Sequence, residues 1–290
     1  MPEKRKICVF IGNRPAILQE IMRIKELQLA HVFILKNSFL YKNRHEIPCR
    51  YTVFGKKDKE KVVSGISRLN FDILISNGCP FVFPGSIISR PGKIFLNIHP
   101  SYLPYFRGMH PVNGILLRGF PYAGATMHFI SDGIDTGNII HREKFRLSAD
   151  IDAGLLYRLV FTLEGKVFAA GMRKLIRSRF RYKGLRQKRL QGDYYTRSLK
   201  DMRLSLAMSS KEMLSRIRAF GVGGQGARCR LNGMDFSIFE AEAIHNEYLM
   251  RNFSRAKAGE ILLEYEGKIL FKTKDGIIKI KRFLRNHSGS

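Results

Sequence analysis

Two side chains with complementary chemistry stand two positions apart at the end of an apolar run. Asn97 and His99 lie in L-N-I-H-P-S-Y-L-P (96–104), and Pro100 follows at once. In an extended segment, positions two apart face the same side of the chain. An amide that donates to a developing oxyanion, beside an imidazole that carries a proton, is typical of acyl transfer. The alternative is structural, with Asn97 satisfying backbone groups and His99 buried in the core.

A carboxylate further along the chain supports the chemical interpretation. Asp135 lies in the loop S-D-G-I-D-T-G (131–137), after the next apolar segment. From there it could orient His99, raise the basicity of the imidazole and relay a proton. Asp132 in the same loop competes for this role, and both aspartates could instead simply stabilise a tight turn.

These residues need a scaffold that brings them together, and the first half of the chain predicts an α/β fold. Apolar runs alternate with segments of helical spacing. We expect strands at 7–11, 31–35, 71–76, 93–98 and 124–130, and helices at 15–28, 58–69 and 152–176. This alternation predicts a Rossmann-like, mostly parallel sheet with flanking helices. Sites in such sheets lie beyond the carboxyl ends of the strands, where Asn97 and His99 stand.

The last third of the chain has a different pattern. A capping box at Ser209-Ser210-Lys211-Glu212 begins a short helix that ends near Phe220. Short strands follow at 227–231, 234–244, 260–265, 268–273 and 277–283, with two-residue turns at 266–267 and 275–276. This pattern predicts a small OB-like β-barrel. We therefore expect a catalytic domain at 1–185, a basic linker at 186–204 and a C-terminal β domain at 205–290.

Composition limits the class of protein. The chain has 290 residues, of which 44% are hydrophobic, so a disordered chain is excluded. No apolar run reaches the roughly 18 residues of a transmembrane helix. The four cysteines match no zinc or redox spacing, so we expect free thiols, no metal and a cytoplasmic location. The 51 Lys and Arg against 24 Asp and Glu give a net charge of +27, which favours a polyanionic partner: nucleic acid, a phosphorylated metabolite or an anionic membrane surface.

Two strings in the sequence resemble a known family. L-N-I-H-P-S-Y-L-P-Y-F-R-G (96–108), followed by G-A-T-M-H-F-I-S-D-G-I-D-T-G-N-I-I (124–140), is similar to the 10-formyltetrahydrofolate-dependent formyltransferases. Members of that family act on methionyl-tRNA, glycinamide ribonucleotide or nucleotide sugars. The resemblance covers roughly residues 7–180, and the C-terminal part also resembles the small barrel domain of the family.

The resemblance implies roles for individual residues. Asn97, His99 and Asp135 match the catalytic triad of the family. A substrate amine would attack the formyl carbon of 10-formyltetrahydrofolate, Asn97 and protonated His99 would stabilise the oxyanion, and Asp135 would hold His99 and help to remove the amine proton. The folate would insert between two loops, contacting Asn77, Gly78, Cys79, Phe81, Ser131, Asp132 and Gly133. Cys79 is expected to be an ordinary buried thiol rather than a nucleophile.

The amine substrate is expected to face the end of the first strand. Gly12, Asn13 and Arg14 follow that strand, and they do not form a G-x-G-x-x-G dinucleotide fingerprint. Arg14 and Arg107 could each contact a phosphate of the substrate, or could be ordinary surface arginines.

The resemblance leaves the amine open. Y-F-R-G-M-H-P-V-N differs from the W-R-G-A-A-P-I usual in tRNA enzymes, and D-Y-Y-T-R-S (193–198) resembles a Y-Y-x-R element of sugar formyltransferases. These features favour a nucleotide-linked amino-deoxysugar, feeding lipopolysaccharide or O-antigen synthesis. The twelve Lys and Arg at 173–203 favour charged initiator tRNA instead. A homodimer and a non-catalytic binding protein of the same fold are further possibilities, although the intact triad disfavours the latter.

Overall fold

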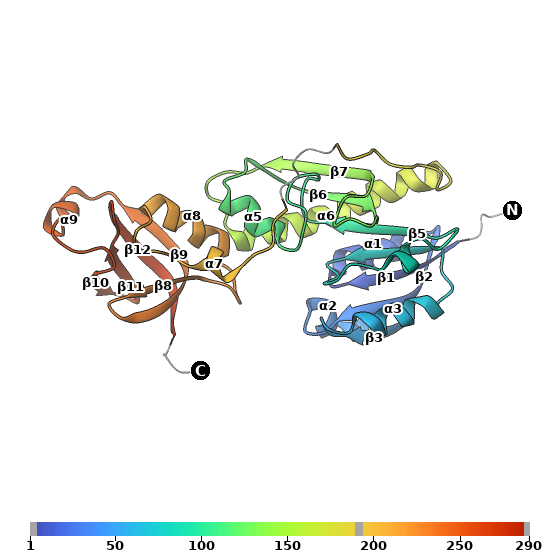
Figure 1. The fold of residues 1–290 in the computed structure, drawn as a ribbon, viewed down its shortest axis with the longest axis horizontal. Coiled ribbons are helices and arrows are strands. Elements are labelled where there is room, and N and C mark those ends of the chain that lie inside the picture. Colours follow the sequence, from blue (N-terminus) through green and yellow to red (C-terminus); the bar gives the residue numbers. More distant parts are fainter. Residues whose placement is uncertain (1–4, 189–193, 287–290) are drawn as a thin grey trace. The chain divides into compact units, whose positions relative to one another are not determined.

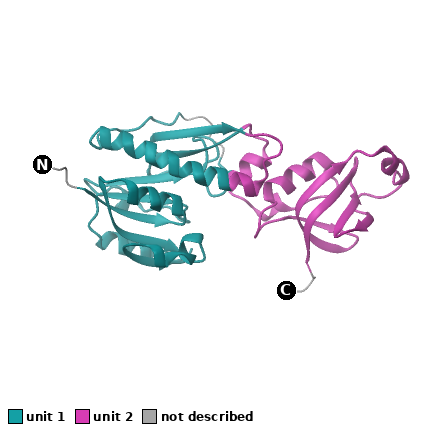
Figure 2. Cartoon of the chain, turned by 180° about the vertical axis from the view of Figure 1, so that it is seen from behind, with its two compact units in different colours: residues 1–111, 122–146, 158–195 teal, residues 112–121, 147–157, 196–290 magenta. Residues whose placement is uncertain are grey.

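The chain forms two compact units, which Figure 2 shows in different colours. The computed structural model describes residues 5–188 and 194–286. Unit 1 comprises residues 1–111, 122–146 and 158–195, and unit 2 comprises residues 112–121, 147–157 and 196–290. This division differs from the expected domain ranges of 1–185, 186–204 and 205–290, because two early segments pack within unit 2.

Hydrogen bonds show what holds these early segments in unit 2. The side chain of Asn113 donates to the carbonyl of Ala219 at 2.7 Å. The guanidinium of Arg218 donates to the carbonyls of Ile151 and Ser148, both at 2.7 Å. Both contacts involve the helix at 210–220, so a boundary drawn only along the sequence misses them.

Unit 1 is built on a seven-stranded sheet with the order β3-β2-β1-β4-β5-β6-β7 (Figure 1). The strands are β1 (Lys6–Gly12), β2 (Leu27–Leu35), β3 (Arg50–Phe54), β4 (Ile73–Asn77), β5 (Ile94–His99), β6 (Tyr122–Phe129) and β7 (Ile139–Arg146). The five strands from β3 to β5 pair in parallel, whereas β6 pairs antiparallel with both β5 and β7. The prediction of a Rossmann-like, mostly parallel sheet is therefore confirmed.

Helices cover both faces of this sheet because alternate residues of each strand face opposite sides. Cys8 and Phe10 of β1 join one core, which includes apolar side chains of α1 (Pro15–Arg23) and α6 (Ala153–Arg177). Val9 and Ile11 join the other core, with side chains of α3 (Lys59–Arg68). Short helices complete the unit: α2 (Phe39–Lys42), a 3₁₀ turn (Arg44–Glu46) and α4 (Gly85–Ile88).

Some expected elements differ in extent. The helix expected at 15–28 is wrong at its end, because α1 stops at Arg23 and Ile24 is extended. Leu27 is the buried first residue of β2, so its apolar side chain serves a strand rather than a helix face. Strands β3 and β7 were not expected from the sequence. β7 has only two fully buried residues, at its start, and so lacks a strong apolar pattern.

Unit 2 contains a five-stranded antiparallel sheet with the order β10-β11-β12-β9-β8. Its strands are β8 (Ala227–Leu231), β9 (Met234–Ile244), β10 (Ile261–Tyr265), β11 (Lys268–Lys272) and β12 (Ile277–Asn286). The helices are α7 (Leu199–Met202), α8 (Ser210–Phe220), α9 (Glu247–Asn252) and, apart from its first residue, α5 (Pro111–Leu117). The prediction of a small antiparallel β domain is confirmed.

Helix α8 supplies part of the core of unit 2. The predicted capping box is present: Ser209 accepts from the Glu212 N–H, and the Glu212 carboxylate accepts from the Ser209 N–H. Met213 and Ile217 of α8 then pack against apolar residues of β8, β9, β11 and β12. Within residues 5–188 and 194–286, no helix has the length and hydropathy needed to cross a membrane.

Candidate active site

Antiparallel pairing at the carboxyl end of β5 brings the first polar residues together. In the β5–β6 register, Asn97 lies opposite His128 and His99 lies opposite Thr126. Asn97, His99 and His128 therefore project from the same face of the sheet, as the two-residue spacing requires. His128 was not anticipated from the sequence, because the expectation of a parallel sheet did not specify which residue of 124–130 would oppose Asn97.

Asp135 lies at the centre of this group. Its carboxylate is 3.4 Å from His99 Nδ1 and 3.5 Å from His128 Nε2. It also accepts a hydrogen bond from Asn97 Nδ2 at 3.2 Å and one from the Gly108 N–H at 2.9 Å. The structure thus brings Asn97, His99 and Asp135 together, as expected, and adds His128 and a backbone N–H to the set.

The charge of Asp135 is stabilised by these neighbours. Burial by itself would raise the pKa of the Asp135 carboxyl. The neighbouring His99 and His128 rings and the Gly108 N–H outweigh this effect and hold the pKa of Asp135 well below its usual range. Asp135 is therefore a carboxylate throughout the pH range in which proteins function.

His99 lies between two acceptors. Its Nε2 is 2.9 Å from the carbonyl oxygen of Phe106, and its Nδ1 faces Asp135. Only 4% of the residue is exposed, and this burial lowers the pKa of His99, although Asp135 and the Phe106 carbonyl oppose the effect. A neutral imidazole can donate to only one of these two acceptors. When His99 is protonated, both of its ring nitrogens can donate, so the imidazolium forms a second hydrogen bond.

The Asn97 amide is fully engaged as a donor. Its Nδ2 lies 3.1 Å from His128 Nε2 and 3.2 Å from Asp135 Oδ1. His128 in turn places Nδ1 2.8 Å from the Phe129 carbonyl, which indicates a proton on Nδ1 and an accepting Nε2. To donate to an oxyanion, Asn97 must break one of these two hydrogen bonds. If the bond to Asp135 breaks, the bond to His128 still holds the amide in place.

A second polar cluster lies where β1 and β4 end. Asn77 is fully buried and donates to the carbonyl of Ile98 at 2.9 Å and to Glu164 at 3.0 Å. Glu164 on α6 is fully buried as well, 3.3 Å from Arg14 Nε. Burial raises the pKa of Glu164 to about 7, with Arg14 and Asn77 acting in the opposite direction. The Arg14 guanidinium also lies 3.6 Å from the ring centroid of Phe161.

The other residues expected to bind substrates lie in varied surroundings. A side chain on Gly12 would collide with the Asn77 carbonyl, and one on Gly78 would meet Asn13, so the ends of β1 and β4 pack closely. Arg14 has a side chain that is 19% exposed. Arg107, in contrast, is only 7% exposed and donates to Gln187 through Nε at 3.3 Å and Nη2 at 2.6 Å.

The loops expected to hold folate differ in exposure. Asp132 and Gly133 are exposed, whereas Ser131 is half-buried and lies 2.9 Å from the hydroxyl of Thr136. Phe81 packs edge-on against Phe54 and Phe83. Burial raises the pKa of the Cys79 thiol to about 12, so this thiol is protonated and poorly nucleophilic at neutral pH.

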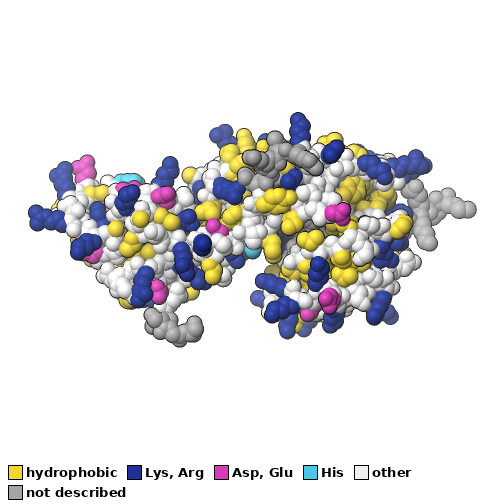
Figure 3. Space-filling model, viewed as in Figure 1, with side chains coloured by type: hydrophobic (Ala, Val, Ile, Leu, Met, Phe, Trp, Pro, Cys, Tyr) yellow, Lys and Arg dark blue, Asp and Glu magenta, His cyan; other side chains and the backbone are white. Residues whose placement is uncertain are grey.

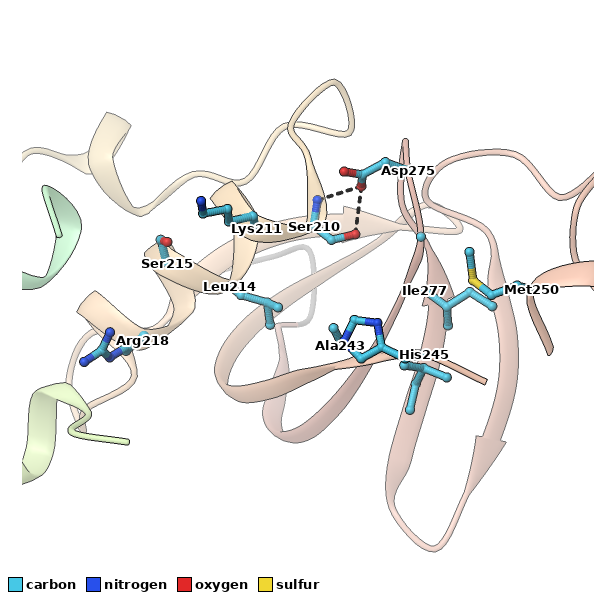
Figure 4. A pocket seen from close by; sticks show the side chains of 12 residues that line it. Ser210, Lys211, Leu214, Ser215, Arg218, Ala243, His245, Met250, Asp275 and Ile277 are labelled. Atoms are coloured by element: carbon cyan, nitrogen blue, oxygen red, sulfur yellow. Dashed lines mark hydrogen bonds between the residues drawn. The ribbon is translucent and has the colours of Figure 1, made fainter. Parts of the chain in front are cut away.

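A cavity lies within unit 2, and none of the candidate site residues described above lines it. It measures about 480 Å³ and lies between α8 and residues of β9 and β12 (Figure 4). The backbone N–H and the hydroxyl of Ser210 both donate to Asp275 at 2.8 Å, which ties the start of α8 to the β11–β12 turn. These two hydrogen bonds in the wall of the cavity thus stabilise the fold of unit 2.

Fold and site together define a class of protein. An amide, an imidazole and a low-pKa carboxylate converge at the carboxyl end of a mostly parallel α/β sheet, the usual place for ligands in such folds. This arrangement is suited to group transfer at a carbonyl carbon.

Two protein-family models match this chain. The formyl transferase model matches residues 5–171, and the model of the formyl transferase C-terminal domain matches residues 198–288. The chain belongs to the formyl transferase family.

The relatives and solved structures that this chain resembles have different descriptions. Methionyl-tRNA formyltransferase of Caldicellulosiruptor saccharolyticus is 27% identical over 229 residues, covering 78% of this chain and 70% of the relative. The N-formyltransferase from Helicobacter canadensis, solved with folinic acid and dTDP-3-aminofucose, has a TM-score of 0.69 at 19% identity, covering 97% of this chain and 100% of that one. HypX from Aquifex aeolicus also has a TM-score of 0.69, at 15% identity, and this chain covers 46% of its length.

Proposed function

We propose that this protein is an N-formyltransferase that moves the formyl group of 10-formyltetrahydrofolate to the amine of a nucleotide-linked amino-deoxysugar. The observation that carries the formyl-transfer step is the convergence of Asn97, His99 and Asp135 within a single hydrogen-bonded group. Folate as the donor is supported by family membership and by similar structures solved with tetrahydrofolic acid or folinic acid.

The proposed steps follow from these side chains. The amine attacks the formyl carbon, which forms a C–N bond and a tetrahedral oxyanion. Asn97 donates an N–H to that oxyanion. The proton of the amine passes by way of the Asp135 carboxylate to neutral His99, 3.4 Å away, and Asp135 then balances the charge of the imidazolium. The bond between N10 and the formyl carbon breaks, and N10 takes the proton to give tetrahydrofolate.

Two observations support a sugar acceptor. WlaRD, described as a sugar 3N-formyl transferase, has a TM-score of 0.65 at 22% identity, and the match covers 99% of each chain. The Helicobacter canadensis enzyme is also matched over its whole length. The Y-Y-T-R string lies at 194–197, and Tyr194 and Tyr195 fall within unit 1 beside Arg107. In this proposal the reaction is cytoplasmic and supplies surface polysaccharide synthesis.

Charged initiator tRNA is the second candidate. The relative from Caldicellulosiruptor saccharolyticus described above and a second one from Clostridium tetani, 24% identical, are methionyl-tRNA formyltransferases. The net charge of +27 also suits a polyanion, and Lys and Arg side chains are spread over both units on the face in Figure 3. The motif differences at 105–113 and 193–198 favour the sugar.

The test is a panel of acceptors. The protein is mixed with 10-formyltetrahydrofolate and with UDP-, GDP- and dTDP-amino sugars or charged initiator tRNA, and the release of tetrahydrofolate is measured. Release with an amino sugar is expected. Release with tRNA alone would overturn the sugar assignment, and release with neither would overturn both acceptors.

The triad has its own test. His99→Asn should lower turnover by at least about 100-fold, because the proton carrier is lost. Binding of folate, measured by calorimetry, should persist, since the imidazole is directed at protein groups. Near-normal turnover of the variant would show that the triad is wrongly assigned.

A further inference from the structure

The chain returns to the active-site loop after α6. The backbone of Leu185 exchanges two hydrogen bonds with Ile139, the first residue of β7, at 2.8 and 2.7 Å. Gln187 comes two residues later and is 9% exposed. The Leu185 pairing therefore delivers the Gln187 side chain to the loop that carries Asp135.

The Gln187 amide joins two loops of the site. Its Nε2 donates to the carbonyls of Asp135 at 2.9 Å and Gly137 at 2.8 Å. Its Oε1 accepts from Arg107 Nε at 3.3 Å and Nη2 at 2.6 Å. Both N–H groups and both lone pairs are used, so this amide has no spare hydrogen-bonding capacity.

The two loops meet again at the Asp135 carboxylate. Asp135 has a φ of +53°, a left-handed conformation that is unfavourable for a non-glycine residue. Arg107 precedes Gly108, whose N–H donates to Asp135 Oδ2 at 2.9 Å. The Arg107 carbonyl accepts from the Tyr195 N–H at 2.8 Å, which fixes the loop from its other side.

We propose that Gln187 is a positioning residue for formyl transfer: its amide holds the 131–137 loop and the 106–108 loop together, so that the Asp135 carboxylate stays on His99. This proposal rests on the proposed function only in assuming that His99 and Asp135 act in the reaction. It does not depend on which amine is the acceptor.

Kinetics of two variants test the proposal. Gln187→Met keeps the length of the side chain and removes all four hydrogen bonds, and Gln187→Glu keeps the acceptor for Arg107 but loses both donors. Both should lower kcat by about tenfold or more, with KM for either substrate changed by less than about threefold, because a misplaced Asp135 affects the transition state more than binding. Asn138→Ala is the control, since it removes only the bond from Asn138 to the Lys183 carbonyl, at 2.9 Å between the same two segments.

An NMR titration of His99 without substrates provides a second measurement. Burial lowers the pKa of His99, the Asp135 carboxylate and the Phe106 carbonyl raise it, and His128 and Arg107 lower it. A displaced Asp135 should therefore move the midpoint of His99 to lower pH in Gln187→Met than in the wild type. The His99 signal is assigned as the one that His99→Asn lacks.

The outcomes separate this proposal from the proposed function. If no acceptor in the panel is formylated but the His99 midpoint still falls, the assignment of the acceptor fails, whereas the placement of Asp135 on His99 by Gln187 stands. A folded Gln187→Met with wild-type kcat and an unchanged His99 midpoint overturns the positioning role, as does an Asn138→Ala defect of equal size. If Gln187→Met does not fold, Gln187→Glu is judged by the same criteria.

Discussion

The buried environment of Glu164 makes the stability of the folded protein depend on pH. It is fully buried beneath Arg14 and Asn77, and its pKa rises from 4.5 to about 7. Between these two values the folded protein keeps a proton that the unfolded chain releases. The contribution of Glu164 to stability is therefore highest at low pH and falls as the pH rises through this window, by on the order of 3 kcal/mol.

Glu164→Gln should remove this dependence. The amide oxygen can still accept from Asn77, but the group no longer ionises. The free energy of unfolding of the variant minus that of the wild type should increase from pH 4.5 to pH 7.5, measured by denaturant titration. Glu60→Gln, at an exposed position on α3, is the control and should show a much smaller change. If the difference in free energy of unfolding between Glu164→Gln and the wild type did not change with pH, a raised pKa of the buried Glu164 carboxyl would be contradicted.

Sequence reasoning identified some residues of the site and missed others for physical reasons. Asn97, His99 and Asp135 were found because a two-residue spacing and a glycine-rich loop are local patterns. His128 depends on the antiparallel register between β5 and β6, which no local pattern specifies. Gln187 lies 52 residues after Asp135 and is brought to it by the Leu185–Ile139 pairing, so only the tertiary structure shows its contacts.

At the scale of elements, the switch from parallel to antiparallel pairing determines the site. A slip of one residue between β5 and β6 would turn His128 to the other face of the sheet. The longer helices α1, α3, α6 and α8 and the parallel strands β1, β2, β4 and β5 were predicted approximately, because buried strands and amphipathic helices have strong apolar periods. The edge strands β3 and β7 were missed, since strands at an edge bury fewer side chains.

Helix α8 organises unit 2 through Arg218. Its guanidinium donates to the carbonyls of Ser148 and Ile151, which join the 147–157 segment to the unit. Arg218→Ala should lower the free energy of unfolding by about 1–3 kcal/mol, because two carbonyls lose charged donors. Lys211→Ala, an exposed change on the same helix, should stay within about 0.5 kcal/mol. Equal effects in chemical denaturation would show that Arg218 is not a specific tie.

At the scale of the whole molecule, the charge of +27 makes salt a way to distinguish acceptors. A protein that makes 6–10 phosphate contacts with a nucleic acid loses roughly 10³–10⁵ in affinity between 50 and 200 mM salt. A nucleotide sugar carries only a diphosphate. KM for the sugar should therefore rise by less than about tenfold over this range in steady-state assays. A rise of several hundredfold would contradict recognition of the sugar through a single diphosphate.

The return of the chain to β7 has a consequence for synthesis on the ribosome. Asn97, His99 and Asp135 all emerge before α6 is complete, yet Leu185 and Gln187 follow that helix. A nascent chain therefore contains these three side chains for some time before the Gln187 amide, which joins their loops, leaves the exit tunnel. Enzymatic competence should appear late, once residue 187 and the neighbouring Tyr194 and Tyr195 are free to fold onto the earlier segments.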